Sequence, residues 1–264
     1  MLDARTISFL HSGDMGDIVA GMGAVKEYCE SRRAKARLLL DTSGGWHDEL
    51  CVRQSKGLGM KFGRAQLAYL SPLLLAQPFV ARVEEWDGKE APDTDLNAFR
   101  RGFCRPWSAE TRKNLLYCHQ KALGLPIGWR GPWLRVPVPS EPVREWLAAR
   151  SSRYHASDQI FKKHLHEIGA FVGTDLELRA FEDCFRVMPN RVLAPTALDL
   201  AEEIAASRNI IVNGTLAYWI AVGVGHPHIV HEAGVNIPTT VFAEDVPGLE
   251  YAQGAGIKPK GELR

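Results

Sequence analysis

The feature that most constrains the fold lies in the first 43 residues, where a strand-like segment, a glycine-rich turn, a helical pattern and another strand-like segment follow one another. Residues 5–10, "RTISFL", predict a short strand, and residues 16–32 carry apolar side chains at helical spacing. The next segment, "ARLLLDTS" at 36–43, is apolar enough for a parallel sheet that is covered on both faces. This order predicts a right-handed strand–helix–strand unit.

A second series of the same kind follows a proline-rich segment. Residues 126–142 contain five prolines, which predicts a stiff and extended linker. Beyond this linker, four strand-like segments alternate with helical patterns. We therefore predict an α/β protein with two Rossmann-like parallel-sheet domains, over residues 1–136 and 137–264, that face each other across a cleft. Ligands bind beyond the carboxyl ends of parallel strands, so this cleft is the expected site.

The segment between the first unit and the linker is less regular. We expect a helix that ends near Gln77, a strand over 81–86, a loop over 94–103 and a helix that stops at Gly124. Several tryptophans lie in or near the linker, and we expect them to pack between the domains rather than to stack on a base or sugar ring. They are Trp107, Trp129, Trp133 and Trp146.

Composition excludes several classes of protein. The chain is 45% hydrophobic and 24% charged, as in ordinary globular proteins, and its net charge of +1 gives no overall field that would attract nucleic acid. The five cysteines, at 29, 51, 104, 118 and 184, include no CxxC pair, so we expect buried, reduced thiols. The sequence has neither a membrane-length apolar run nor a signal-peptide pattern, which predicts a cytoplasmic protein. The histidines show no HExxH pattern, and we predict no metal site.

The opening glycine-rich turn carries two acids, Asp14 and Asp17. Their charge would repel a phosphate held against them, and the turn lacks the lysine of a P-loop. One interpretation is that a carboxylate at the cleft acts as a general base on an attacking hydroxyl. The other is that both acids only cap the helix that follows. The sequence does not decide between the two acids as the base.

Two patterns in the second half suit a phosphate ligand. The polar triplet Asn213-Gly214-Thr215 lies between a buried strand and a helix, where N–H and hydroxyl donors would gather at a helix start. The alternative is an ordinary turn in which Thr215 caps the helix. In "ARSSRYH" at 149–155, Arg150, Ser152 and Arg153 follow a predicted strand, and arginine is the preferred bidentate partner of phosphate. The alternative is that these arginines are ordinary surface residues.

Together these segments resemble the heptosyltransferase-like glycosyltransferases of family 9. The N-terminal match is "SGDMGDIVAGMGAV" at 12–25, where the family has a loop with a catalytic aspartate, a role that falls on Asp17. The C-terminal match covers residues 171–181 and 196–232, in which Asn213 and Thr215 fall on the Asn and Ser of the family's turn. The resemblance implies a GT-B fold and an inverting, metal-independent enzyme without a cofactor.

The implied reaction moves a sugar from a nucleotide-diphosphate sugar to a hydroxyl of a glycan or small-molecule acceptor. From the patterns and the resemblance together, we predict Asp17 and Asp14 as the catalytic residues. The predicted donor-binding residues are Gly16, Arg150, Ser152, Arg153, Gly173, Asn213, Gly214, Thr215 and Glu232.

The sequence departs from the family at three positions in the turn and helix. Gly214 replaces an Asp, Leu216 a Gly and Trp219 a His, which alters the donor pocket and leaves the sugar nucleotide open. Three alternatives therefore stay open: an inactive relative that binds a nucleotide or glycan, a sugar-nucleotide epimerase, and a transferase that acts on a modified base in DNA. In the last case residues 99–107 and Arg112-Lys113 would line a groove.

Overall fold

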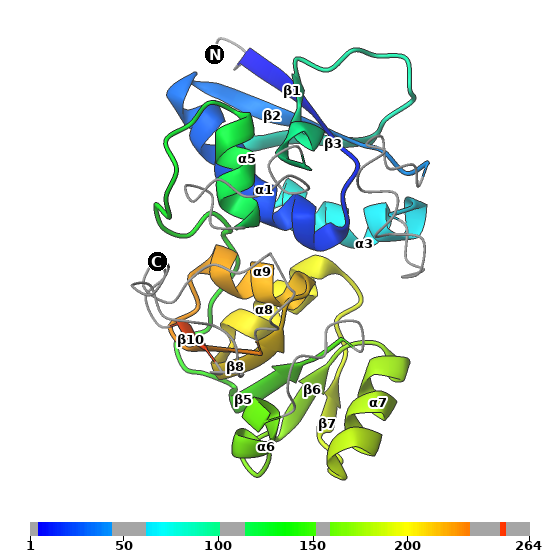
Figure 1. Ribbon diagram of the computed structural model, residues 1–264, viewed down its shortest axis with the longest axis vertical. Coiled ribbons are helices and arrows are strands. Elements are labelled where there is room, and N and C mark those ends of the chain that lie inside the picture. Colours follow the sequence, from blue (N-terminus) through cyan, green and yellow to red (C-terminus); the bar gives the residue numbers. More distant parts are fainter. Residues whose placement is uncertain (1–4, 44–61, 101–113, 152–158, 233–248, 252–264) are drawn as a thin grey trace, which may run out of the picture.

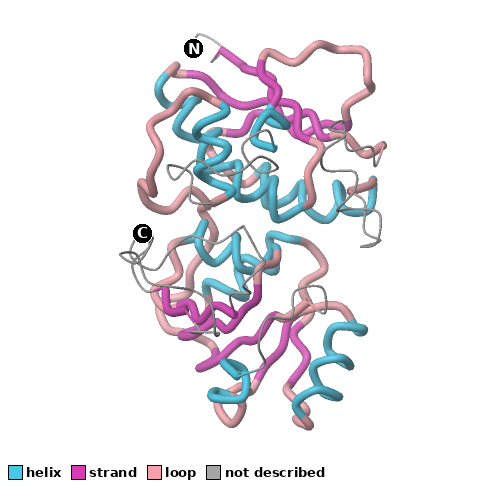
Figure 2. Tube along the Cα trace, viewed as in Figure 1, coloured by secondary structure: helices cyan, strands magenta, loops and turns pink. Residues whose placement is uncertain are grey.

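Two α/β domains, each built on a parallel sheet, make up the computed structural model, which describes residues 5–43, 62–100, 114–151, 159–232 and 249–251 (Figure 1). Helices lie beside both sheets, and the two sheets are at opposite ends of the molecule with helices between them (Figure 2). The predicted class, two Rossmann-like parallel-sheet domains, is confirmed. The boundary at residues 136 and 137 stays a prediction.

The N-terminal domain contains the predicted strand–helix–strand unit. Strand β1 (Arg5–His11) leads into helix α1 (Met15–Ser31) and then strand β2 (Ala34–Leu40), which pairs with β1 in parallel. The described strands form a sheet in the order β3-β2-β1-β4. The remaining elements are α3 (Arg64–Leu75), β3 (Val80–Glu85), β4 (Thr94–Asp95), a 3-10 helix (Leu96–Ala98) and α5 (Leu115–Ala122).

The prediction of a loop over 94–103 is wrong at its start. Thr94 and Asp95 form strand β4 beside β1, and a 3-10 helix follows. The cause is a long-range contact, because the Asp93 carboxylate accepts both the N–H and the hydroxyl of Ser8, each at 2.8 Å. These bonds bring the segment alongside β1, which no local pattern could indicate.

The C-terminal domain repeats the alternation over a second parallel sheet. Its described strands follow the order β10-β9-β8-β5-β6-β7, so the chain starts in the middle of the sheet and fills both sides. The strands are β5 (Arg144–Ala149), β6 (Ala170–Val172), β7 (Asn190–Val192), β8 (Ser207–Asn213), β9 (Ile229–Glu232) and β10 (Leu249–Tyr251). The helices are α6 (Gln159–His164), α7 (Asp175–Phe185), α8 (Ala197–Ala205) and α9 (Leu216–Val224).

The linker joins the domains through Trp133, which is 3% exposed. Its indole N–H donates to the Val19 carbonyl of α1 at 3.0 Å, and the N–H groups of Trp133 and Leu134 both donate to the Gly223 carbonyl of α9 at 2.8 Å. A side chain at residue 223 would come within 2.7 Å of Leu134, so this close approach needs glycine. The predicted packing of Trp133 between the domains is confirmed, and it holds α1 and α9 side by side.

The cysteines agree with their prediction only in part. Cys29 and Cys118 are buried, and burial raises the pKa of the Cys29 thiol to about 12, so it is inert at neutral pH. Cys184 is exposed, which corrects the expectation for that residue, since it lies on the outer side of α7. Cys51, Cys104 and Trp107 lie outside the described residues. Among the described residues, no helix combines the length and the apolar character that a bilayer crossing requires.

Candidate functional site

A cavity of about 410 Å³ lies between the domains, at the carboxyl ends of strands in the second sheet. One side is formed by residues that follow β5, β6 and β7 and by the first residues of α9. The other side is formed by the N-terminal residue of α1 and by α3. The lining residues are Met15, Ala65, Gln66, Tyr69, Ala149, Arg150, Ser151, Val172, Gly173, Thr174, Glu177, Ala194, Leu200, Thr215, Leu216 and Ala217. This is the place that the topology predicts for a ligand.

The acidic turn leads into α1, whose first residue, Met15, lines the cavity; Asp14 and Asp17 are not among the lining residues. Asp14 is the N-cap residue and Asp17 is the N3 residue of a capping box, in which the Asp17 carboxylate accepts the Asp14 N–H at 3.3 Å. Both side chains are half-buried. Both acids therefore take part in the cap, and the choice between a cap alone and a cap with a catalytic base stays open. A carboxylate has two oxygens with about four acceptor sites, so the cap contact is compatible with a second role at the cleft.

The turn is shaped by a buried pair of histidines that the sequence analysis did not find. The N–H of Gly13 donates to His11 Nδ1 at 2.8 Å, so the His11 proton is on Nε2. That nitrogen lies 3.1 Å from His119 Nε2, and His119 Nδ1 lies 2.8 Å from the Leu115 carbonyl. Both rings are thus neutral, with His11 donating to His119. A side chain at residue 13 would lie 2.5 Å from His11 and 2.8 Å from Asp17, so the turn requires glycine.

Burial keeps these histidines neutral. It lowers the pKa of His11 well below 6.5, and the nearby His119 and Arg100 lower it further. Burial likewise lowers the pKa of His119 to about 4. On the C-terminal side, burial lowers the pKa of His231 to about 3. The sequence signal for His11 is its position as the last residue of a strand before the turn, whereas His119 is 108 residues away in the chain.

We expect the free energy of unfolding to fall as the pH is lowered from about 6.5 toward 4. Unfolded histidine titrates near 6.5, whereas folded His119 titrates at about 4. In that window the unfolded state binds protons that the folded state excludes, and each such histidine removes up to about 1.4 kcal/mol per pH unit. Urea unfolding across this range measures the slope. His119→Gln, which can still accept from His11, should show a smaller slope, and an unchanged slope would contradict the assignment.

The start of α9 meets the start of α1 at the same cavity. A side chain at Gly16 would lie 3.4 Å from Trp219 and within 3.8 Å of the backbone of Thr215 and Leu216. The Thr215 hydroxyl donates to the Asn213 carbonyl at 3.2 Å, and no side chain of the described residues caps the helix. Thr215 is therefore the N-cap residue, as that alternative predicts, but its side chain makes no cap hydrogen bond. An uncapped helix N-terminus at a cavity suits an anionic group.

Asn213 holds this turn in place through its side-chain amide. Its side-chain oxygen accepts the Ser151 N–H at 3.1 Å, and its side-chain N–H donates to the Ser151 carbonyl at 2.7 Å. The residue is 0% exposed. The amide ties the end of β8 to the end of β5, which is a positioning role, and the predicted contact with a donor stays a prediction. Gly214, between Asn213 and Thr215, is half-buried at the same turn.

Arg150 and Glu232 form a buried ion pair at the ends of β5 and β9. Arg150 Nε lies 3.0 Å from Glu232 Oε2, and the two side chains are 3% and 1% exposed. Arg150 lines the cavity, and Glu232 holds its guanidinium rather than offering a carboxylate to a donor. Gly173 also lines the cavity. Ser152 and Arg153 lie outside the described residues, so their predicted roles stay predictions.

Little of the basic groove proposed for DNA falls within the described residues. Arg100, at its start, is 1% exposed and its guanidinium donates to the hydroxyl and carbonyl of Ser12 at 3.2 and 3.1 Å. Arg100 therefore supports the turn before α1 and is not available for a phosphate backbone. Residues 101–113, with Arg112 and Lys113, lie outside the described part of the chain.

The arrangement of the two domains has close structural counterparts. A family 9 glycosyl transferase from Veillonella parvula superimposes with a TM-score of 0.59 and 11% identity, over 95% of this chain and 86% of that chain. The E. coli heptosyltransferase WaaC, solved with ADP-2-deoxy-2-fluoro heptose, gives a TM-score of 0.56 and 9% identity, over 95% and 94%. This chain has the GT-B fold of the family 9 glycosyltransferases.

A third structure of this fold is larger than the chain. The glycosyltransferase TibC of enterotoxigenic E. coli, described as iron-containing and dodecameric, gives a TM-score of 0.55 and 10% identity, over 94% of this chain and 62% of that chain. No protein-family model matches the sequence, and neither does any curated protein. In the described residues, no three His, Cys, Asp or Glu side chains gather as a metal site would require.

Proposed function

We propose that the chain is a glycosyltransferase that moves a sugar from a nucleotide-diphosphate sugar to an acceptor hydroxyl. One observation carries the proposal: the start of α1, which carries the two acids, and the start of α9, which has no side-chain cap bond, approach each other, and Met15 and Thr215 line one cavity between two GT-B domains. The first offers a base and the second offers donors for an anion. This also explains why the opening glycine turn is acidic, since the phosphates would lie on the opposite domain.

In the proposed reaction, Asp17 takes the proton of the acceptor hydroxyl as its oxygen attacks the anomeric carbon. The bond from that carbon to the diphosphate oxygen breaks, and its electron pair leaves with the nucleoside diphosphate. Attack from the face opposite the leaving group inverts the configuration. The N–H groups at the start of α9 and the guanidinium of Arg150 would stabilise the developing negative charge, which is why we propose a reaction without a metal.

Leu216 supports a second candidate, an inactive relative that binds the nucleotide without transfer. The family resemblance places a glycine at this position, whereas the Leu216 side chain occupies part of the cavity wall. Trp219, where the resemblance places a histidine, is 2% exposed and packs against Gly16. A narrower pocket could retain a nucleotide and exclude the sugar. Binding and turnover therefore have to be measured separately.

We expect a nucleoside diphosphate to raise the melting temperature of the chain. A ligand that binds only the folded state at one hundred times its Kd stabilises that state by about 2.7 kcal/mol. The test is a thermal-shift panel of ADP, UDP, GDP, CDP and dTDP with their sugar conjugates, beginning with ADP because WaaC was solved with an ADP-heptose analogue. Product analysis with and without an acceptor follows, in the presence and absence of a chelator.

Each outcome of this panel has a defined meaning. A shift with one base, followed by an inverted glycoside whose yield a chelator does not change, supports the proposal in full. Loss of turnover with the chelator contradicts metal independence alone. Binding without transfer supports the inactive relative, and an altered donor sugar without acceptor supports an epimerase. No shift with any nucleotide contradicts both transferase and nucleotide-binding proposals for this donor class.

A further inference from the structure

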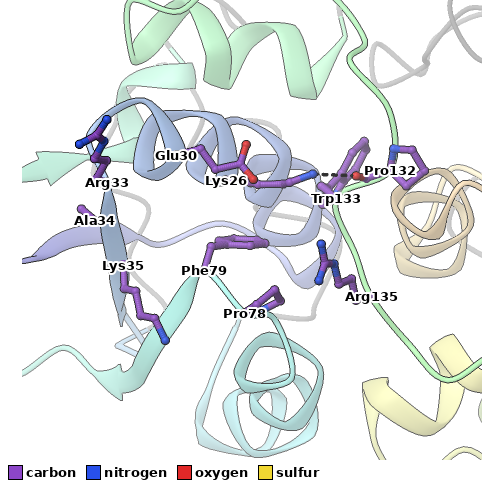
Figure 3. A pocket seen from close by; sticks show the side chains of 10 residues that line it. All are labelled: Lys26, Glu30, Arg33, Ala34, Lys35, Pro78, Phe79, Pro132, Trp133 and Arg135. Atoms are coloured by element: carbon purple, nitrogen blue, oxygen red, sulfur yellow. Dashed lines mark hydrogen bonds between the residues drawn. The ribbon is translucent and has the colours of Figure 1, made fainter. Parts of the chain in front are cut away.

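A second cavity, of about 420 Å³, lies on the N-terminal domain away from the cleft (Figure 3). It is built by the last turns of α1, the beginnings of β2 and β3, and the linker. Its lining residues are Lys26, Glu30, Arg33, Ala34, Lys35, Pro78, Phe79, Pro132, Trp133 and Arg135. Lys26 lies 11 residues beyond Met15 on α1, or about 16 Å along the helix, so this basic pocket is separate from the site at the start of α1.

The charge of the basic pocket is strongly unbalanced. Four cations, Lys26, Arg33, Lys35 and Arg135, line it with a single acid, Glu30. Within the described residues none of these four side chains forms an ion pair, although the whole chain has a net charge of only +1. Several other arginines do pair with carboxylates: Arg37 with Glu84, Arg64 with Glu85, Arg130 with Glu27, Arg191 with Asp175 and Arg208 with Glu145.

Arg33 and Lys35 are exposed at the edge of the cavity, whereas Lys26 is held against the linker. Arg33 has a φ of 51°, a left-handed conformation at the end of a helix that glycine would adopt with less strain. Arg186, at the end of α7, has the same conformation with a φ of 59°, so the backbone alone assigns no role to the Arg33 side chain. The Lys26 ammonium donates to the Pro132 carbonyl at 3.1 Å, which fixes it against the linker.

The remaining lining residues define the size and character of an occupant. Phe79 and Trp133, which are 8% and 3% exposed, form the apolar part of the lining together with two prolines. Pockets of roughly 300–1,000 Å³ bind small molecules, whereas binding to a polymer or to a membrane surface does not require a cavity. Cations at the edge of a cavity with an apolar lining are suited to a ligand whose ring carries several phosphates.

We propose that the basic pocket binds a small soluble ligand with two or more phosphate groups on a sugar-sized body. Arg33 and Lys35 would contact the phosphates from the α1–β2 side, and Lys26 and Arg135 from the linker side. The ring of the ligand would rest on Phe79. This inference does not depend on the proposed transferase function, because it uses other residues at the opposite end of the strands.

The test is isothermal titration calorimetry at low salt with fructose 1,6-bisphosphate and, as a phosphate-only probe, inorganic pyrophosphate. The wild type should bind the bisphosphate more tightly than pyrophosphate. The double variant Arg33→Glu, Lys35→Glu should bind it at least about tenfold more weakly, since each charge-assisted contact contributes substantially. Lys162→Glu, Lys163→Glu is the matched control, because it makes the same charge change at two exposed lysines of α6.

Four results would overturn the proposal. The first is no heat of binding for either probe with the wild type at millimolar concentration and low salt. The second is equal affinity of the wild type and the Arg33, Lys35 variant, which would place the bisphosphate elsewhere. The third is binding to vesicles of anionic phospholipid without binding of the bisphosphate, which would make the surface a membrane contact. Equal weakening in the α6 control would assign the effect to net charge and would also overturn the site.

Discussion

Asp17→Asn is expected to lower the rate of sugar transfer by about 10²–10⁴-fold, the usual contribution of a general base. Asparagine keeps the size of the side chain and an oxygen that can accept the Asp14 N–H, so the capping box at the start of α1 survives. What is lost is the ability to take a proton. Nucleotide affinity should change little, because the donor phosphates are assigned to the start of α9. The measurements are single-turnover rates at saturating donor and, separately, the Kd of the nucleoside diphosphate.

The matched control is Asp14→Ser, which removes the neighbouring charge and keeps a good N-cap residue. If Asp17 is the base, this variant retains most of the activity. If Asp14→Ser loses turnover while Asp17→Asn keeps it, the two acids exchange roles. Unchanged turnover in both single variants would reject a general base in this turn. Weaker nucleotide binding in Asp17→Asn would instead mean that the acid supports the donor site.

The sequence predicts this fold well where the pattern is local. The strand, glycine turn and helix at 5–31 follow from a short strand-like run, a glycine-rich turn and helical spacing within one short segment. The helices α7 and α8 carry a Thr at the N-cap with an acid three residues later, a capping box that can be read directly from the sequence. The strand β7 was missed because it has three residues and lies after Pro189, in a segment that resembles a loop.

The candidate site is predicted less completely, because its contacts join distant parts of the chain. The turns and their residue types are visible locally, but the partners are not: Asn213 binds Ser151 across 62 positions, and Arg150 binds Glu232 across 82. The structure therefore gives Asn213 and Glu232 positioning contacts that the sequence did not indicate, and their predicted contacts with a donor stay predictions. The pair of His11 with His119 was missed for the same reason, since separation in sequence carries no information about contact.

The positioning residues act by fixing the strand ends around the turn before α9. A helix N-terminus can hold a phosphate only if its N–H groups are aimed at a fixed place, and the turn before α9 has no cap of its own among the described residues. Asn213 and the Arg150–Glu232 pair fix the strand ends on either side of that turn. Preorganised donors need no rearrangement during the reaction, and this lowers the free-energy barrier at such sites. Substitutions of these residues should thus change both the free energy of unfolding and the activity at the cavity.

Glu232→Ala is expected to lower the free energy of unfolding by about 3–5 kcal/mol, because it removes the carboxylate that lies 3.0 Å from the buried Arg150 guanidinium. For a protein of this size the melting temperature should fall by roughly 10 °C. Calorimetry and urea denaturation measure both quantities. The double variant Arg150→Met, Glu232→Leu should recover most of the loss, since apolar residues of similar volume can replace a buried pair.

The chain offers a control with the same geometry and a different environment. Arg208 Nε lies 3.0 Å from Glu145 Oε2, the same separation as in the buried pair, but the two side chains are 59% and 65% exposed. Glu145→Ala should therefore cost only about 0–1 kcal/mol. Equal losses in Glu232→Ala and Glu145→Ala would show that burial does not set the cost. If the double variant regains stability yet loses nucleotide affinity, Arg150 contributes to donor binding as well as to the fold; if it keeps full affinity, Arg150 has only the structural role.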